Sequence, residues 1–191
     1  MLSSCIPLVF LFHALFGITE NIPDTQTCLS KEELELNKLI TKYRKQNGLP
    51  AIPLSHKLTQ VAQAHAKDLD ENYDFDPNNT CNPHSWSDQG SWKACCYTND
   101  HKSPECMWEK PAEISGYSGH GYEIAFYHSD MATANTSLEG WKKSTAHNNV
   151  LLNKAIWKEI TWNAIGIGIY GKHSTVWFGR ESDDGQPGRC D

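Results

Sequence analysis

The segment 164–180 constrains the fold of this chain more than any other. Its first half, AIGIGIY, alternates three isoleucines with two glycines, which is the two-residue period of a half-buried strand. Glycines inside a strand indicate a face against which another part of the molecule packs very closely. GKHS then supplies a turn, and residues 175–180 return as the partner strand. We therefore predict a β-hairpin with one isoleucine face and one closely covered glycine face.

Two amphipathic helices are predicted before this hairpin. Ser30 and Glu33 have the spacing of a capping box, and the helix that they begin ends at Asn47-Gly48. An extended link with two prolines follows, and Ser55 begins the second helix. His65 lies on the apolar stripe of this second helix. We interpret it as a partly buried, hydrogen-bonded histidine rather than a ligand.

The middle of the chain predicts a short strand over 123–127 and a helix over about 130–144. The inner face of that helix is expected to contain Met131, Ala134, Leu138 and Trp141. His147 follows, where a transition from helix to loop would expose its side chain. Helices at the start, a helix in the middle and a terminal hairpin indicate an α+β fold with helices on an antiparallel sheet.

The N-terminus and the cysteines indicate a secreted protein. Residues 6–18 are apolar apart from His13 and too short to span a membrane, so we predict a signal peptide over 1–20 and one domain over 21–191. No transmembrane segment is predicted after it. Secretion makes Asn78 and Asn135 candidate glycosylation sites. Six of the seven cysteines follow the signal peptide and are expected to form three disulfides: Cys28, Cys81, Cys95, Cys96, Cys106 and Cys190.

The disulfide pairing is left open, except that adjacent Cys95 and Cys96 are not expected to bond to each other and Cys190 is expected to tie the tail to the body. Four cysteines lie between 81 and 106, without the paired spacing of a zinc site. Residues 72–121 also contain four prolines, and they predict loops and short turns held by disulfides. Three tryptophans in this part are expected to form a small satellite core, or alternatively to line an apolar groove for a lipid, sterol or protein: Trp86, Trp92 and Trp108.

Three polar residues far apart in the sequence are candidates for one polar cleft: His84 in NPHSWSD, Glu123 in GYEIAFY and His147 in TAHNN. Two imidazoles and a carboxylate can bind Zn²⁺ or another divalent metal. The same groups could transfer protons, or could form a hydrogen-bonded network that binds nothing. Ser85 is unsuited to act with its neighbour His84, and oxidised cysteines offer no thiolate, so no nucleophile is predicted.

These pieces, in this order, resemble the CAP superfamily, which comprises cysteine-rich secretory proteins, antigen 5 and plant pathogenesis-related proteins. The resemblance covers residues 33–180 and rests on the helix pair that begins LNKLITKYRKQNGLP, on WKKSTAHNNVLLN, and on IGIGIY with VWFG. It implies a three-layer α-β-α sandwich with a central antiparallel sheet and disulfide-stapled loops. The insert 86–121, rich in Cys and Trp, has no place in the common family pattern.

The resemblance also implies a tetrad of two histidines and two acidic residues. His84 and His147 match the two histidines, and Glu123 matches the glutamate, although Tyr122 and Ile124 replace the glycine and asparagine that usually flank it. The fourth position is open. Its candidates are Glu105, Glu109, Glu113 and Asp88, of which Glu113 is preferred.

We expect recognition outside the cell rather than turnover. The net charge of −6 and the lack of a basic stripe argue against nucleic acid as a partner. The expected cofactor is Zn²⁺ or another divalent metal, and otherwise none. The alternatives are a metal-assisted, peptidase-like hydrolase that uses the same residues, and a carrier of lipid or sterol. The extracellular protein or lipid ligand and the oligomeric state stay open.

Overall fold

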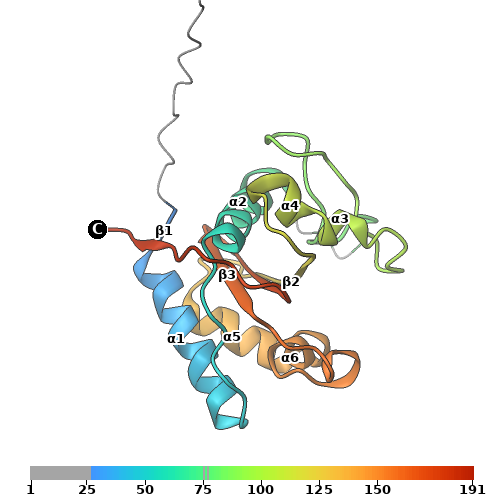
Figure 1. The fold of residues 1–191 in the computed structure, drawn as a ribbon. Coiled ribbons are helices and arrows are strands. Elements are labelled where there is room, and N and C mark those ends of the chain that lie inside the picture. Colours follow the sequence, from blue (N-terminus) through green and yellow to red (C-terminus); the bar gives the residue numbers. More distant parts are fainter. Residues whose placement is uncertain (1–26, 75, 77) are drawn as a thin grey trace, which may run out of the picture.

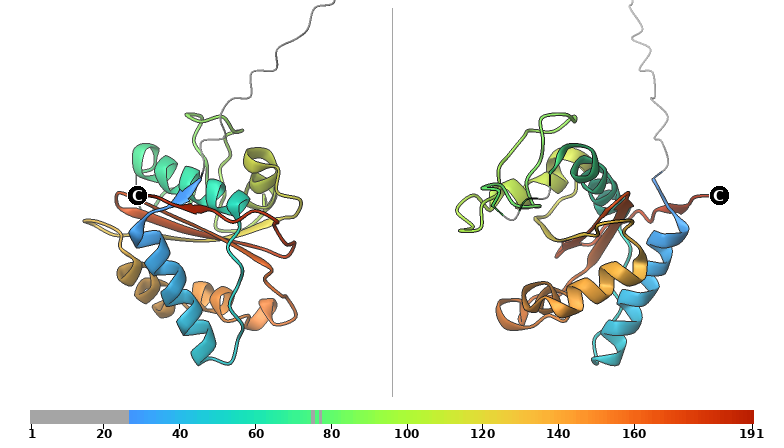
Figure 2. Two further views of the ribbon diagram at one scale, coloured as in Figure 1. Left: turned by 60° about the vertical axis from the view of Figure 1, so that its left-hand side comes forward. Right: turned by 180° about the vertical axis from the view of Figure 1, so that it is seen from behind.

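The computed structural model describes residues 27–191 except 75 and 77, so the predicted signal peptide lies outside the described residues. The described chain folds into three layers (Figure 1). A sheet forms the middle layer, with helices α2 and α4 on one side and α1, α5 and α6 on the other (Figure 2). The predicted α+β class and α-β-α sandwich are confirmed. Within the described residues, no helix combines the length and the apolar character that crossing a membrane requires.

The central sheet consists of three antiparallel strands in the order β2-β4-β3. They are β2 (Gly121–Tyr127), β3 (Ala164–Tyr170) and β4 (His173–Gly179). The register places Glu123 of β2 opposite Trp177 of β4. The predicted hairpin and the strand over 123–127 are therefore confirmed. A separate parallel pair joins β1 (Cys28–Leu29) to β5 (Gly188–Arg189).

Helix α2 (His56–Asn72) covers the glycine face of β3. A Cβ atom on Gly166 would lie 2.0 Å from the carbonyl carbon of Leu58, and one on Gly168 would lie 2.2 Å from the carbonyl oxygen of Ala62. No side chain fits at either position, since the backbone of α2 occupies the space. The predicted close packing on the glycine face is confirmed.

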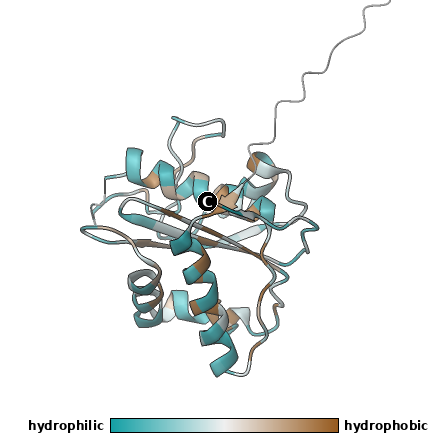
Figure 3. Ribbon diagram, turned by 90° about the vertical axis from the view of Figure 1, so that its left-hand side faces the viewer, coloured by the Kyte–Doolittle hydropathy of each residue, from teal (hydrophilic) through white to brown (hydrophobic). Residues whose placement is uncertain are grey.

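The isoleucine face of the sheet packs against α1 (Lys31–Gln46) and α5 (Ala134–Lys143). Ser30 and Glu33 form the predicted capping box, in which Ser30 N donates to Glu33 Oε2 at 2.7 Å. Figure 3 shows apolar residues prevailing in the central strands and hydrophilic and apolar positions mixed along the helices. The resulting core is mainly aliphatic, and its largest fully buried side chains include Leu36, Ile40, Leu151 and Ile165.

The predicted helix over 130–144 is four residues too long at its start. Thr133 caps α5 through a capping box with Thr136, so residues 130–133 stay outside the helix. Met131 was assigned to the inner face but is 59% exposed, whereas Trp141 is fully buried. At its other end, α5 continues almost directly into α6 (Thr145–Leu151), and the 3-10 turn η1 (Ala155–Trp157) follows. The predicted transition from helix to loop before His147 is thus a junction between two helices.

Residues 72–121 were expected to form only loops and turns, but they contain two short helices, α3 (Glu105–Trp108) and α4 (Lys110–Ser115). Pro111 is compatible with α4 because it lies in the first turn, where proline removes no helical hydrogen bond. Gly116 ends the helix with a φ of 65°, a conformation that glycine adopts without strain.

The six cysteines form three disulfides, as predicted. The bonds are Cys81–Cys96 and Cys95–Cys106 in the insert, and Cys28–Cys190, which ties the tail to the body.

The predicted satellite core is confirmed for two of the three tryptophans. Trp86 is 3% exposed, and its ring packs edge-on against that of Trp92 with 4.9 Å between centroids. Both belong to a second cluster with Leu58 and Val61 of α2 and Trp177 of β4. Trp108 is 36% exposed and instead stacks on the ring of His120. The assignment of Trp108 to this core was therefore wrong.

Candidate functional site

Glu123 occupies the face of β2 that is turned toward α2, while its neighbour Ile124 points into the aliphatic core. The Glu123 side chain is completely buried. Its Oε1 lies 2.5 Å from His65 Nδ1, and its Oε2 lies 2.7 Å from His84 Nδ1. Both carboxylate oxygens thus bind an imidazole. We call His65, His84, Glu123 and His147 the His–Glu site.

His65 uses both ring nitrogens. Its Nε2 lies 2.9 Å from the carbonyl oxygen of Ser85, which can only accept, so Nε2 carries a hydrogen. Its Nδ1 faces the carboxylate of Glu123, which also accepts. With Glu123 ionised, His65 donates from both nitrogens, which is the hydrogen-bond pattern of an imidazolium. The prediction that His65 is hydrogen-bonded is confirmed, although the side chain is fully rather than partly buried.

The pKa of Glu123 reflects two opposing effects. Burial alone would raise the pKa, but the charge of His65 and the hydrogen bonds from His65 and His84 hold the pKa below its ordinary value. The carboxylate therefore stays ionised in a fully buried position. Trp86 covers the imidazolium of His65, with ring centroids 4.0 Å apart and planes 9° apart.

His84 donates from Nδ1 to Glu123, so its Nε2 carries a lone pair when the ring is neutral. The His84 side chain is 17% exposed, unlike those of His65 and Glu123. The loop before it is fixed locally, because His84 N donates to Asn82 Oδ1 at 3.0 Å. His84 is thus held by a buried carboxylate and retains one nitrogen able to bind a ligand.

His147 lies in the first turn of α6, where its backbone N–H faces the capping hydroxyl of Ser144. The pKa of His147 is lowered to about 4, mainly by burial and also by the neighbouring His84, while Glu123 acts in the opposite direction. His147 is consequently neutral at physiological pH. Within the described residues, no hydrogen bond joins its ring to His84 or Glu123, so the coupling among them is electrostatic.

The candidates for a fourth acidic residue make other contacts. Glu113 accepts from Lys110 Nζ at 2.6 Å and from the backbone N–H of Lys93. Across the described chain, no hydrogen bond or ion pair links Glu105, Glu109, Glu113 or Asp88 to the His–Glu site. The additional direct partner of Glu123 is His65. The position of His65 on the apolar stripe of α2 predicted only that its side chain points inward.

The serine and cysteine side chains considered as nucleophiles already form other bonds. Ser85 is 8% exposed, and its hydroxyl accepts from Tyr97 N at 2.8 Å and faces Tyr97 O at 3.4 Å. The six cysteines of the described chain are all in disulfides. Neither Ser85 nor a cysteine is therefore free to attack a substrate.

The imidazoles of His84 and His147 are the groups of the His–Glu site that could hold a metal. His84 turns Nδ1 toward Glu123 and leaves Nε2 for a ligand, and His147 offers a neutral ring, while both oxygens of Glu123 bind imidazole N–H groups. No group of three or more His, Cys, Asp and Glu side chains within the described chain has the arrangement of a metal site. A histidine that binds a metal commonly donates its other N–H to a carboxylate. The contact between His84 and Glu123 has this form, so Glu123, predicted as a ligand, is also placed to orient His84.

Comparison with known families identifies the class of protein. Residues 38–178 match the model of the CAP family, described as the cysteine-rich secretory protein family. The chain therefore belongs to this family, as its sequence predicted. No curated protein sequence matches the chain.

Three solved structures share the fold. An extracellular protein containing an SCP domain from Bacillus anthracis is 21% identical with a TM-score of 0.53, over 78% of this chain and 40% of its own. A cysteine-rich secretory protein from Staphylococcus aureus is 13% identical with a TM-score of 0.53, over 78% of this chain and 38% of its own. An outer surface protein from Borrelia burgdorferi is 19% identical with a TM-score of 0.51, over 79% of this chain and 94% of its own. The chain thus spans well under half of the first two proteins, and at these identities the likeness concerns the fold.

Proposed function

We propose that this protein acts outside the cell by binding rather than turnover, and that His84 and His147 hold Zn²⁺ or a similar divalent metal. The observation that carries the proposal is the pair of hydrogen bonds to Glu123, from His65 Nδ1 and His84 Nδ1. They fix His84 in the tautomer whose Nε2 can bind a metal. His147, neutral because of its lowered pKa, supplies the second imidazole.

The role of Glu123 follows from its partners. A carboxylate that binds an imidazole N–H orients the ring and makes its other nitrogen a better donor. His65, as an imidazolium, neutralises the charge of Glu123 without competing for the metal. When bound, Zn²⁺ would supply a Lewis acid with positions open to water or to a ligand.

An extracellular location is supported by the three disulfides, because disulfides persist in oxidising compartments. The Bacillus anthracis structure is described as an extracellular protein and the Borrelia burgdorferi structure as an outer surface protein. We extend this location to the present chain. Binding is favoured over covalent catalysis because Ser85 and the cysteines of the described chain are engaged.

The test is a calorimetric titration of Zn²⁺ into the metal-free chain lacking residues 1–20. We expect one site that is weakened by at least about tenfold in His84→Ala and in His147→Ala. Glu123→Gln should weaken binding by about 10–100-fold, and a thermal melt measures what the loss of the buried pair with His65 costs in stability. His120→Ala is the matched control, since this exposed histidine lies outside the His–Glu site.

Zinc affinity that is unchanged in both His84→Ala and His147→Ala would contradict the proposal. Peptide hydrolysis that is abolished by a chelator and by His147→Ala would favour the hydrolase instead. Both measurements use the same purified protein, so binding and turnover are separated directly.

A further inference from the structure

The last five residues of α2 contain three acidic residues and no basic residue. Asp70 pairs with His173, whose Nδ1 lies 3.2 Å away, and Glu71 lies 3.8 Å from Lys67 Nζ. Asp68 forms no ion pair in the part of the chain that the structure describes, although it is only 4% exposed. The C-terminal end of a helix carries a partial negative charge, which adds to the charge of Asp68 instead of offsetting it.

The partners of Asp68 are all neutral. Its Oδ1 accepts from Asn72 Nδ2 at 2.9 Å and from the hydroxyl of Ser87, and its Oδ2 accepts from Ser87 N at 2.9 Å. Both oxygens accept from N–H donors, an arrangement that suits a carboxylate. The hydrogen bonds orient it but supply no positive charge. A buried carboxylate without a countercharge is unfavourable and becomes more favourable when a cation is placed beside it.

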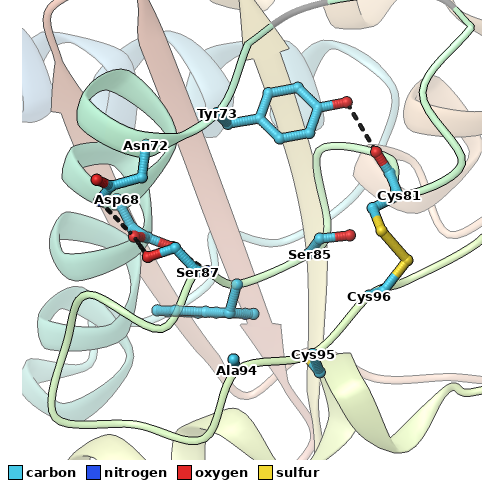
Figure 4. A pocket seen from close by; sticks show the side chains of 10 residues that line it. Asp68, Asn72, Tyr73, Cys81, Ser85, Ser87, Ala94, Cys95 and Cys96 are labelled. Carbon is cyan, nitrogen blue, oxygen red and sulfur yellow. Dashed lines mark hydrogen bonds between the residues drawn. A yellow bond between two sulfur atoms is a disulfide. The ribbon is translucent and has the colours of Figure 1, made fainter.

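Asp68 lines a pocket of about 440 Å³ between the end of α2 and the insert. Figure 4 shows Asp68, Asn72 and Ser87 on one side of this pocket and the Cys81–Cys96 disulfide on the opposite side. Trp86 and Ala94 add apolar surface. The hydroxyl of Tyr73 is engaged, because it donates to the carbonyl oxygen of Cys81 at 3.0 Å. Among the described lining residues, Asp68 is the only one charged at neutral pH.

We propose that this pocket binds a small organic cation, an ammonium group on a compact apolar body. The ammonium would lie against Asp68, whose Oδ2 has a lone pair left for a further donor, and the apolar body against Trp86 and the disulfide. The volume is within the range of pockets that hold small molecules. No residue of the His–Glu site lines this pocket, but Ser85 and Trp86, which do, contact His65 from its other side.

The test is calorimetry of 2-phenylethylamine against 2-phenylethanol, with the disulfide-bonded chain lacking residues 1–20 and with chelator present. The amine should bind at least about tenfold more tightly than the alcohol, since the alcohol lacks the charge that pairs with Asp68. Asp68→Asn should remove this preference. Ala94→Leu should weaken binding of the amine, because the larger side chain fills the pocket while the hydrogen bonds of Asp68 stay intact. Thermal melts of both variants verify folding.

A further measurement uses Nα-acetyl-lysine N-methylamide, whose free side chain presents an ammonium as a lysine of a protein does. Binding that depends on Asp68 and exceeds that of 2-phenylethylamine would support the cation site and assign it to a lysine of a partner. Equal binding of amine and alcohol would overturn the proposal. Wild-type affinity in both Asp68→Asn and Ala94→Leu, or no binding of either cation, would overturn it as well.

Discussion

The two faces of the central sheet are built differently. The face toward α1 and α5 is mainly aliphatic: Ile124, Ile167 and Val176 lie in one buried cluster, which also contains Trp141 and Phe178. The face toward α2 combines glycines, tryptophans and the buried pair of His65 and Glu123. The first face stabilises the fold through apolar contact, which tolerates conservative change. The second depends on close backbone approach and on charges that must stay paired, and all of the proposed chemistry lies on it.

The largest expected effect compares neighbouring residues of β3 that point to opposite faces. Gly166→Val should cost at least about 5 kcal/mol or prevent folding, since its Cβ would lie 2.0 Å from the backbone of α2. Ile167→Val, in the aliphatic core, should cost only about 1 kcal/mol. Denaturant unfolding measures both variants. Similar costs for the two would break the distinction between the faces.

The next effect concerns the buried pair. His65→Ala should cost about 3–5 kcal/mol, because it leaves Glu123 buried without its cation. The double variant His65→Ala/Glu123→Leu should be more stable than His65→Ala alone, since it removes the buried charge. Urea denaturation of the wild type, His65→Ala, Glu123→Leu and the double variant gives the coupling energy between the two residues. If the second change instead adds its own full cost, Glu123 does not depend on His65.

A smaller effect is expected from His147 as the pH changes. Its pKa falls from an ordinary 6.5 to about 4 on folding, so between these values the unfolded chain binds the proton and the folded chain does not. Stability therefore decreases as the pH falls from 6.5 toward 4, by about 2 kcal/mol after allowance for partial exposure. The lowered pKa of Glu123 acts in the same direction at the acidic end.

His147→Gln should flatten this slope in chelator-treated protein, as followed by denaturant midpoints at several pH values. His128→Gln serves as a control on a histidine outside the His–Glu site. A slope that survives His147→Gln unchanged would assign the pH dependence to other groups.

The smallest effect is expected at Trp108, which we compare with Trp86 of the same insert. Trp108→Ala should change stability by less than about 0.5 kcal/mol, because Trp108 is partly exposed and stacks only on His120. Trp86→Ala should cost about 3–5 kcal/mol, since Trp86 covers His65 and packs on Trp177. Thermal unfolding compares the two. A large loss with Trp108→Ala would show that the satellite core extends further than the contacts indicate.

The sequence predicted the features that depend on local pattern. The alternation in AIGIGIY predicted which residues lie on each face of β3, and Ser30 with Glu33 predicted the start of α1. Features that depend on tertiary contacts were missed. Helix α4 has six residues in a proline-rich segment and packs against α2, which no local pattern reveals. Met131 has the right spacing for the inner face, but the cap at Thr133 begins the helix after it.

The candidate site was predicted only in part, because it too depends on tertiary contacts. His84 and Glu123 were chosen by resemblance, and they are in direct contact. His65 was recognised as an inward-facing, hydrogen-bonded histidine, yet its partner lies 58 residues away on another element. Helical spacing fixes the direction of a side chain, whereas the identity of its partner depends on how β2 and α2 pack.

The most direct test of the account is the protonation of the imidazole nitrogens, measured by nitrogen-15 NMR of the metal-free chain at pH 7. We predict that both nitrogens of His65 are protonated, that His84 carries its hydrogen on Nδ1 with a bare Nε2, and that His147 is neutral. Finding the hydrogen of His84 on Nε2, or a singly protonated His65, would contradict the arrangement in which Glu123 is held between two donors and leaves His84 free to bind a metal.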